Sequence, residues 1–158
     1  MSTTTDPRRF GRVAVAYGGN SAEREVSLDS GRNVLAALRA RGVDAHPVDG
    51  IPALLDALRA GHYARVFNIL HGRGGEDGML QGALDALRIP YTGSDAATLA
   101  LALDKALAKR LLRQHNVLTP DFQVMSTGRE KLAPGLRFPL VVKPIAEGSS
   151  KGIAAKGV

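Results

Sequence analysis

Three short apolar runs, each followed by a turn and a helical pattern, constrain the fold of this chain most strongly. The runs cover residues 12–17, 45–48 and 65–70. Their length and apolar content favour parallel strands that are buried on both faces. Helical patterns follow them over residues 26–41, 52–60 and 79–87. This alternation predicts an α/β fold with an open, mostly parallel sheet.

The alternation of predicted strands and helices ends after residue 93. The later part predicts helices at 94–102 and 104–115, an irregular stretch at 117–124, a strand at 141–144, a flexible loop at 147–152 and a strand starting at 153–156. A β-hairpin formed by the strands at 141–144 and 153–156 would have no further element in this sequence to pack against. We therefore expect a flexible lead-in at 1–11, an N-terminal α/β domain at 12–100 and an incomplete second domain at 101–158.

Composition narrows the classes of protein that fit. With 44% apolar and 23% charged residues, the chain is of globular type, and without cysteine it has no disulfide framework and no thiolate site. No apolar run approaches the roughly 20 residues of a membrane span, and no signal peptide is recognisable. These features favour a cytoplasmic protein.

The net charge of +6 is concentrated in residues 94–158, which hold ten basic and five acidic side chains. A basic surface suits an anionic partner, including nucleic acid. However, the basic residues are scattered, and aromatic residues for base stacking are almost absent between them. A non-catalytic, basic nucleotide-binding or nucleic-acid-binding domain stays open as an alternative, although we expect no nucleic-acid partner.

The first motif covers residues 18–27. Gly18 and Gly19 allow a tight turn and a close approach of the backbone to a ligand, and Ser21 is placed to cap the next helix. Glu23 and Glu25 then fit two interpretations. They can be acids in a first helical turn that complement the helix dipole, or one of them can accept a hydrogen bond from a substrate ammonium group.

The second motif covers residues 71–78 and contains four glycines. His71, Glu76 and Asp77 could suggest a metal site, but one histidine and two adjacent acids are a thin set for a hard cation. We therefore predict a loop that faces a ligand and holds no metal. Because both glycine-rich loops follow strand ends, they are expected to open onto one crevice.

The third motif combines two lysines with the glycine- and serine-rich loop at 147–152. Lys105 stands at the entry of a predicted helix and Lys143 at the end of a predicted strand. Such lysines are often simply solvated. Beside a loop rich in backbone donors they also supply what a polyphosphate needs, although the spacing is not that of a Walker motif.

The order of these segments resembles the D-alanine:D-alanine ligases of the ATP-grasp superfamily. The matching segments are GGNSAEREVS, LHGRGGEDGMLQG, IPYTGS, LDK and VVKPIAEGSSKGI. The resemblance implies a preATP-grasp domain followed by the start of an ATP-grasp central domain. It further implies that ATP phosphorylates the carboxylate of one D-alanine, that a second D-alanine attacks the acyl phosphate, and that the dipeptide serves peptidoglycan synthesis. The implied cofactor besides ATP is Mg²⁺, for which Mn²⁺ can substitute, and the implied assembly is a homodimer.

The resemblance also assigns roles to individual residues. Glu23 matches the glutamate that holds the ammonium of the first D-alanine, His71 lies beside that subsite, and Ser149 works with Glu23 there. We thus expect Glu23 and Ser149 to be catalytic. The expected ATP and phosphate contacts are Lys105, Lys143, Gly148 and Ser150. The segment 91–94 matches a stretch near the domain junction, without a catalytic role.

Some positions depart from the family pattern. Asp29 and Lys151 are the main ones, and Lys151 stands where a small apolar residue is usual in the phosphate loop; Ala16 and Asn20 are milder changes. The family continues well past this length, and its later part carries the Mg²⁺ ligands, an arginine, a tyrosine and most of the adenine pocket. We therefore expect a longer enzyme, no metal ligand in this portion, and no turnover by these 158 residues alone. An ATP-grasp ligase that joins D-alanine to D-lactate remains an alternative.

Overall fold

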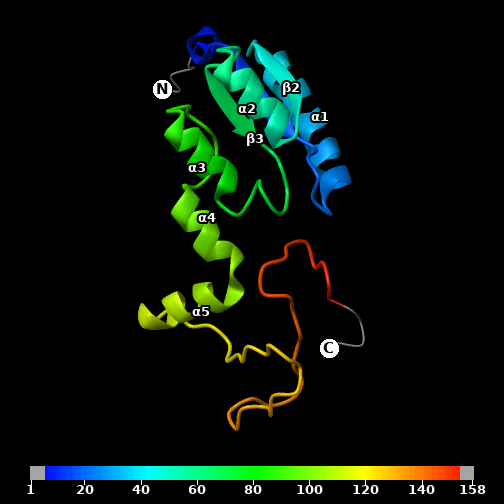
Figure 1. Cartoon of the computed structure of the whole chain (residues 1–158), viewed down its shortest axis with the longest axis vertical. Coiled ribbons are helices and arrows are strands. Elements are labelled where there is room, and N and C mark those ends of the chain that lie inside the picture. Colours follow the sequence, from blue (N-terminus) through cyan, green and yellow to red (C-terminus); the bar gives the residue numbers. More distant parts are fainter. Residues whose placement is uncertain (1–5, 154–158) are drawn as a thin grey trace. The chain divides into compact units, whose positions relative to one another are not determined.

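A three-stranded parallel sheet organises the N-terminal part of the chain (Figure 1). The computed structural model describes residues 6–153 and divides into two units, 1–100 and 101–158. In the first unit the strand order is β2-β1-β3. Its elements are β1 (Val13–Tyr17), α1 (Arg24–Ala40), β2 (Ala45–Asp49), α2 (Ile51–Arg59), β3 (Arg65–Asn68) and α3 (Met79–Ala86). The predicted α/β class with a parallel sheet is confirmed.

The central strand β1 is buried on both of its faces. Val13 and Val15 point to one side, whereas Ala14 and Ala16 point to the other, because side chains alternate along a strand. The first side packs against apolar residues of α1, including Val34, Leu35 and Leu38. The second side packs against residues of α2 and α3, namely Leu54, Leu58, Leu80 and Leu84. Helices on both faces explain why the strand sequence is apolar without alternation.

Helix α1 begins at Arg24, two residues before the predicted start, and Glu23 occupies its N-cap position. The prediction that Ser21 caps this helix is wrong. Ser21 Oγ accepts from the Glu23 N–H at 3.1 Å, within the turn that precedes α1. The short lead-in also contains structure, because Pro7–Phe10 forms a 3-10 helix and Phe10 packs on the α1 side of the sheet.

Helices α4 (Ala96–Leu103) and α5 (Lys105–Gln114) follow, as predicted from the sequence. The strand predicted at 141–144 is wrong: within the described residues of the second unit there is no strand. A strand needs a hydrogen-bonded neighbour, and Val141 and Val142 are 50% and 67% exposed. The strand predicted at 153–156 lies almost wholly outside the described residues. Of the helices described, none combines the length and apolarity needed to cross a bilayer.

Candidate functional site

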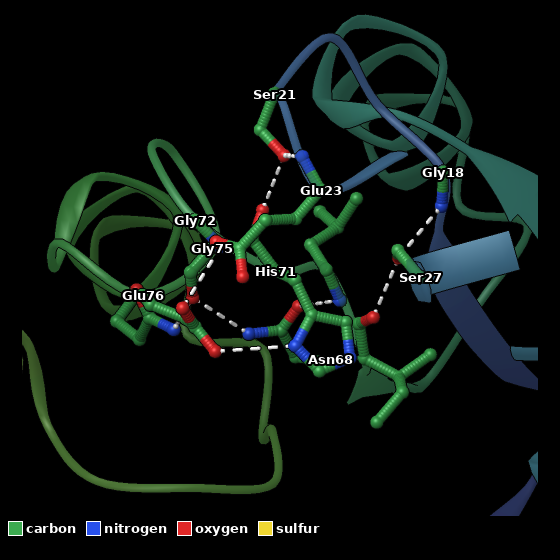
Figure 2. Close-up of polar contacts among 12 residues, drawn as sticks. Gly18, Ser21, Glu23, Ser27, Asn68, His71, Gly72, Gly75 and Glu76 are labelled. Atoms are coloured by element: carbon green, nitrogen blue, oxygen red, sulfur yellow. Dashed lines mark hydrogen bonds and ion pairs between the residues drawn. The ribbon is translucent and has the colours of Figure 1, made fainter. Parts of the chain in front are cut away.

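Both glycine-rich loops lie at the carboxyl edge of the sheet. Strand β1 leads into Gly18, and β3 leads into the loop at 71–78, which we call the glycine loop. Since these strands are parallel, both loops leave the same edge. Ser21 Oγ donates a hydrogen bond of 2.7 Å to the carbonyl oxygen of His71 (Figure 2). The two loops that were expected to share one crevice are therefore in direct contact.

Ser27 makes a second connection between these segments, and sequence reasoning missed it. Its side chain is fully buried on α1. Ser27 Oγ donates to the carbonyl oxygen of Ile69 at 2.7 Å and accepts from the Gly18 N–H at 2.9 Å. The signal was a serine on the inner face of a helix, where a hydroxyl must find partners. Ser27 thus ties the end of β1 to the end of β3.

Glu23 is buried, with 4% of its surface exposed, whereas Glu25 is exposed. In the described part of the chain the hydrogen bonds of Glu23 involve its main chain and not its carboxylate. The carboxylate reaches toward the glycine loop: a Cβ added at Gly72 would lie 2.8 Å from Glu23 Oε2 (Figure 2). A buried carboxylate needs a partner that compensates its lost hydration. The N-terminus of α1 supplies part of this compensation, and a cationic ligand would supply more.

His71 lies at the start of the glycine loop. Its Nδ1 atom is 3.4 Å from Glu76 Oε1. Its Nε2 atom is buried and has no hydrogen-bond partner in the described residues. His71 and Glu76 line a cavity of ≈ 300 Å³ together with the end of β3 and the segment 92–94. The imidazole can therefore offer a nitrogen to a small polar ligand at the sheet edge.

The two acids of the glycine loop hold the loop itself. Glu76 Oε2 accepts from the Gly72 N–H and Asp77 Oδ2 from the Gly74 N–H, both at 2.8 Å. Asp77 Oδ1 also accepts from the Met79 N–H at the start of α3. In the residues that the structure describes, no group of three potential metal-binding side chains comes together. These contacts give Glu76 and Asp77 a structural function in the loop.

Arg24 and Asp49 hold the turn at Gly18 and Gly19, which follows β1. Asp49, at the end of β2, accepts from Arg24 Nη1 at 2.8 Å, from Arg24 Nη2 at 2.6 Å and from the Gly19 N–H at 3.0 Å. Arg24 Nη1 also donates to the Gly19 carbonyl at 2.8 Å. The hydrogen bonds from Arg24, and then the one from Gly19, lower the pKa of Asp49 to about 2. Sequence reasoning missed this pair because its members lie on different elements.

Replacing Asp49 by asparagine should lower the thermal stability at pH 7, and this effect should become small as the pH approaches 2. Since the folded-state pKa of Asp49 is depressed to about 2, its contribution is present above the unfolded pKa of about 3.9. It is lost as the pH falls through about 2. Melting temperatures of both proteins between pH 7 and pH 2 check this. The side chain is 49% exposed, so added salt should reduce the difference.

The exposed pair Asp56 and Arg59 provides the control. These side chains are 3.6 Å apart and are 79% and 68% exposed. Asp56→Asn should change the melting temperature little at any pH. Equal melting temperatures for the wild type and Asp49→Asn at pH 7 would contradict a stabilising clamp.

In the second unit, Lys105 contacts the loop that was predicted to bind phosphate. Asp104 caps α5 by accepting from the Ala106 and Leu107 N–H groups, both at 2.9 Å. Lys105 Nζ donates to the carbonyl oxygen of Glu147 at 2.6 Å and to that of Ile145 at 3.3 Å. The lysine thus holds the stretch just before Gly148, and its ammonium is engaged with backbone carbonyls.

The loop after Gly148 carries Ser149, which is predicted to act on the first D-alanine, and Ser150, which is predicted to contact phosphate. Both serines are exposed and have left-handed φ angles of 46° and 59°. Two consecutive non-glycine residues in this region are uncommon, and such conformations concentrate at ligand clamps. Lys143 is also exposed. The structure brings Lys105 close to this loop, and the roles of all four residues remain predictions.

Comparisons with known proteins agree with the sequence resemblance. A family model described as the D-ala D-ala ligase N-terminus matches residues 53–94. The D-alanine--D-alanine ligase of Xanthomonas axonopodis pv. citri is 52% identical over 158 residues, which cover 96% of this chain and 50% of that protein. The D-alanine--D-alanine ligase of Stutzerimonas stutzeri is 50% identical and covers 99% of this chain and 51% of its own length. The chain spans about half the length of these curated relatives.

Two solved structures of a D-alanine--D-alanine ligase are also similar to this chain. The crystal structure of D-alanine--D-alanine ligase from Bacillus anthracis superimposes with a TM-score of 0.76 at 36% identity, covering 90% of this chain and 48% of that one. The same enzyme complexed with ATP gives a TM-score of 0.74 at 34% identity, with 86% and 48% coverage. Both the α/β fold and the resemblance of the segments are therefore matched by independent comparisons.

Proposed function

Because this chain corresponds to the N-terminal half of the D-alanine--D-alanine ligases, we propose that it supplies the first D-alanine subsite and part of the phosphate site of an ATP-dependent ligase. In the proposed reaction a carboxylate oxygen of the first D-alanine attacks the γ-phosphorus of ATP, and the bond to ADP breaks. The amine of the second D-alanine attacks the resulting acyl phosphate, loses a proton and expels phosphate. The dipeptide would then serve peptidoglycan synthesis.

The buried carboxylate of Glu23 is the observation that carries this proposal. It lies at a helix N-terminus, close to Gly72, and its described hydrogen bonds leave the carboxylate unused. An α-ammonium group would compensate the charge in a site where water is scarce, so the pair would be strong as well as specific. Binding the ammonium there would also hold the substrate carboxylate in one orientation, which lowers the barrier to its phosphorylation.

The proposed subsite for the first D-alanine includes His71, and Ser149 is assigned to it on the family resemblance alone. His71 Nε2 is buried and unpartnered in the described residues, so it is available to a ligand beside Glu23. Ser149 is exposed, with a left-handed backbone, in the loop after Gly148. Its hydroxyl can both donate and accept, which suits a role with Glu23 around the first substrate.

Lys105, Lys143, Gly148 and Ser150 form the proposed contacts to ATP. Two ammonium groups would neutralise charge that develops on the phosphates, and the backbone N–H groups of the loop would add uncharged donors. Lys105 already holds the loop through the Glu147 carbonyl, so it would place the loop as well as attract phosphate. We further propose that the units 1–100 and 101–158 belong to two different domains of the ligase.

Magnesium does not fit the described residues of this portion. Glu76 and Asp77 accept hydrogen bonds within their own loop, and residues 6–153 bring no three potential ligands together. No step of the proposed reaction is therefore assigned to a metal held by these residues. A cytoplasmic location and a homodimeric state are proposed on the family resemblance alone.

The experiment that tests this function measures ADP release by the full-length protein. We expect ADP and D-alanyl-D-alanine when ATP and D-alanine are supplied, and neither when L-alanine replaces D-alanine. A second arm contains D-alanine and D-lactate, and a preference for the mixed product would indicate the depsipeptide ligase instead. Absence of ADP release in every arm would overturn the proposed function.

A further inference from the structure

Two amide side chains converge on a single carbonyl oxygen beneath the glycine loop. Asn68 Nδ2 and Gln81 Nε2 each donate to the carbonyl oxygen of Gly75 at 2.9 Å. Asn68 is the last residue of β3, and Gln81 lies on α3. The loop between these elements is therefore anchored from both sides at Gly75, and Figure 2 shows the contact from Asn68.

Asn68 connects this anchor to both neighbouring segments. Its Oδ1 atom accepts from the Leu70 N–H at 3.1 Å, and its own N–H donates to Thr92 Oγ1 at 3.0 Å. Leu70 directly precedes His71, so the same side chain fixes the backbone before His71 and the carbonyl four residues after it. Only a side chain with both a donor and an acceptor can make these two contacts.

Gln81 occupies a position where burial alone would favour an apolar side chain. It is 1% exposed and stands next to Leu80, which is fully buried. Its Oε1 atom has no hydrogen-bond partner in the described residues, so its burial is costly and only its amide nitrogen is used. A leucine would suit the core better. The hydrogen bond to the Gly75 carbonyl explains why an amide side chain occupies this buried position.

The anchored loop is the one that carries His71. Ser21 donates to the carbonyl oxygen of His71, and Glu76 lies beside the Nδ1 atom of His71. We propose that Asn68 and Gln81 are positioning residues of the first D-alanine subsite, because they fix the glycine loop so that His71 stays beside Glu23. This inference rests on the proposed function for its substrate and on the Gly75 anchor for its mechanism.

The test replaces each amide while keeping its size. Gln81→Met removes the donor to Gly75, and Asn68→Asp removes that donor while keeping the acceptor for Leu70. Met79→Gln is the matched control, since Met79 lies on the same helix and is 70% exposed. If Gln81→Met fails to fold, Asn68→Asp carries the test, because Asn68 is only half-buried.

Two readouts separate positioning from a general loss of stability. In the full-length protein, the KM for D-alanine at the first subsite should rise by about three- to tenfold, which corresponds to one lost hydrogen bond. The KM for ATP should stay unchanged. The second readout is the ring ¹⁵N shifts of His71 without substrate. In the wild type they should report the tautomer favoured by Glu76, with the proton on Nδ1. In Gln81→Met and Asn68→Asp they should report a mixture of the two tautomers.

The outcomes distinguish this inference from the proposed function. If the wild type does not respond to D-alanine, the proposed function fails, and the tautomer measurement still tests the anchor. If Gln81→Met and Asn68→Asp lower the melting temperature but leave both the KM for D-alanine and the His71 tautomer at wild-type values, the positioning role is overturned. The same holds if Met79→Gln changes them equally.

Discussion

Glu23→Gln is expected to weaken D-alanine binding in the full-length protein by about 30-fold or more, because truncating one partner of a buried charge pair costs about 2–5 kcal/mol. Glutamine keeps the shape of the side chain and removes its charge, so the ammonium would lose its counter-ion. Thermal stability should not fall, since the described hydrogen bonds of Glu23 use its main chain. Isothermal titration with D-alanine, together with a melting curve, measures both quantities.

Glu25→Gln is the matched control for this experiment. Glu25 lies in the first turn of the same helix, carries the same charge and is exposed. Its replacement should leave D-alanine affinity within about twofold of wild type, because exposed charges contribute only a few tenths of a kcal/mol. If both variants bind D-alanine like the wild type, the ammonium site is not at Glu23.

Gly75→Ala is expected to lower the free energy of unfolding by about 1–3 kcal/mol through overpacking. A Cβ at this position would lie 2.5 Å from Leu70 Cβ and 2.7 Å from the Leu70 carbonyl oxygen. Backbone cannot give way as a side-chain tip can, so the glycine loop would move. Because this loop carries His71, D-alanine binding should weaken as well. Urea unfolding and titration with D-alanine measure the two effects.

Gly82→Ala should have the opposite effect on stability. Gly82 lies inside α3 and is exposed, and an added Cβ would meet Ala96 Cβ at 4.0 Å, an ordinary contact. Replacing an exposed helical glycine by alanine stabilises by about 0.5–1 kcal/mol. Equal effects of the two substitutions would show that the space around Gly75 is not what matters.

The strands of the first unit were predictable because their signal is local. The apolar run at 12–17 needs helices on both faces, and the structure has them, with α1 on one side and α2 and α3 on the other. The strand expected at 141–144 was wrong, since apolar residues alone do not make a strand without a neighbour to pair with. The local sequence pattern thus predicted strands correctly in the first unit, where each strand has a pairing neighbour in the sheet.

The sequence predicted the residues of the candidate site but not the contacts that hold these residues in place. The motifs pointed to Glu23 and His71 through their order in the chain. The residues that hold them in place have partners far away in the sequence: Ser27 bonds to Ile69, and Arg24 bonds to Asp49. A serine on the inner face of a helix indicates that its hydroxyl needs partners, but neither it nor an arginine indicates which distant residue that partner is.

By itself, the sequence determined an α/β sheet with two glycine-rich loops at one edge, because strand periodicity and turn residues act over a few neighbours. Residue chemistry alone left Glu23 and Glu25 as equivalent acids in one helical turn, and the order of the motifs favoured Glu23. The physical difference between the two acids came from the tertiary structure. It buried Glu23 against Gly72 and left Glu25 in solvent. The physical reason is that burial depends on what the rest of the fold places over a residue, and here that is a loop from the end of β3.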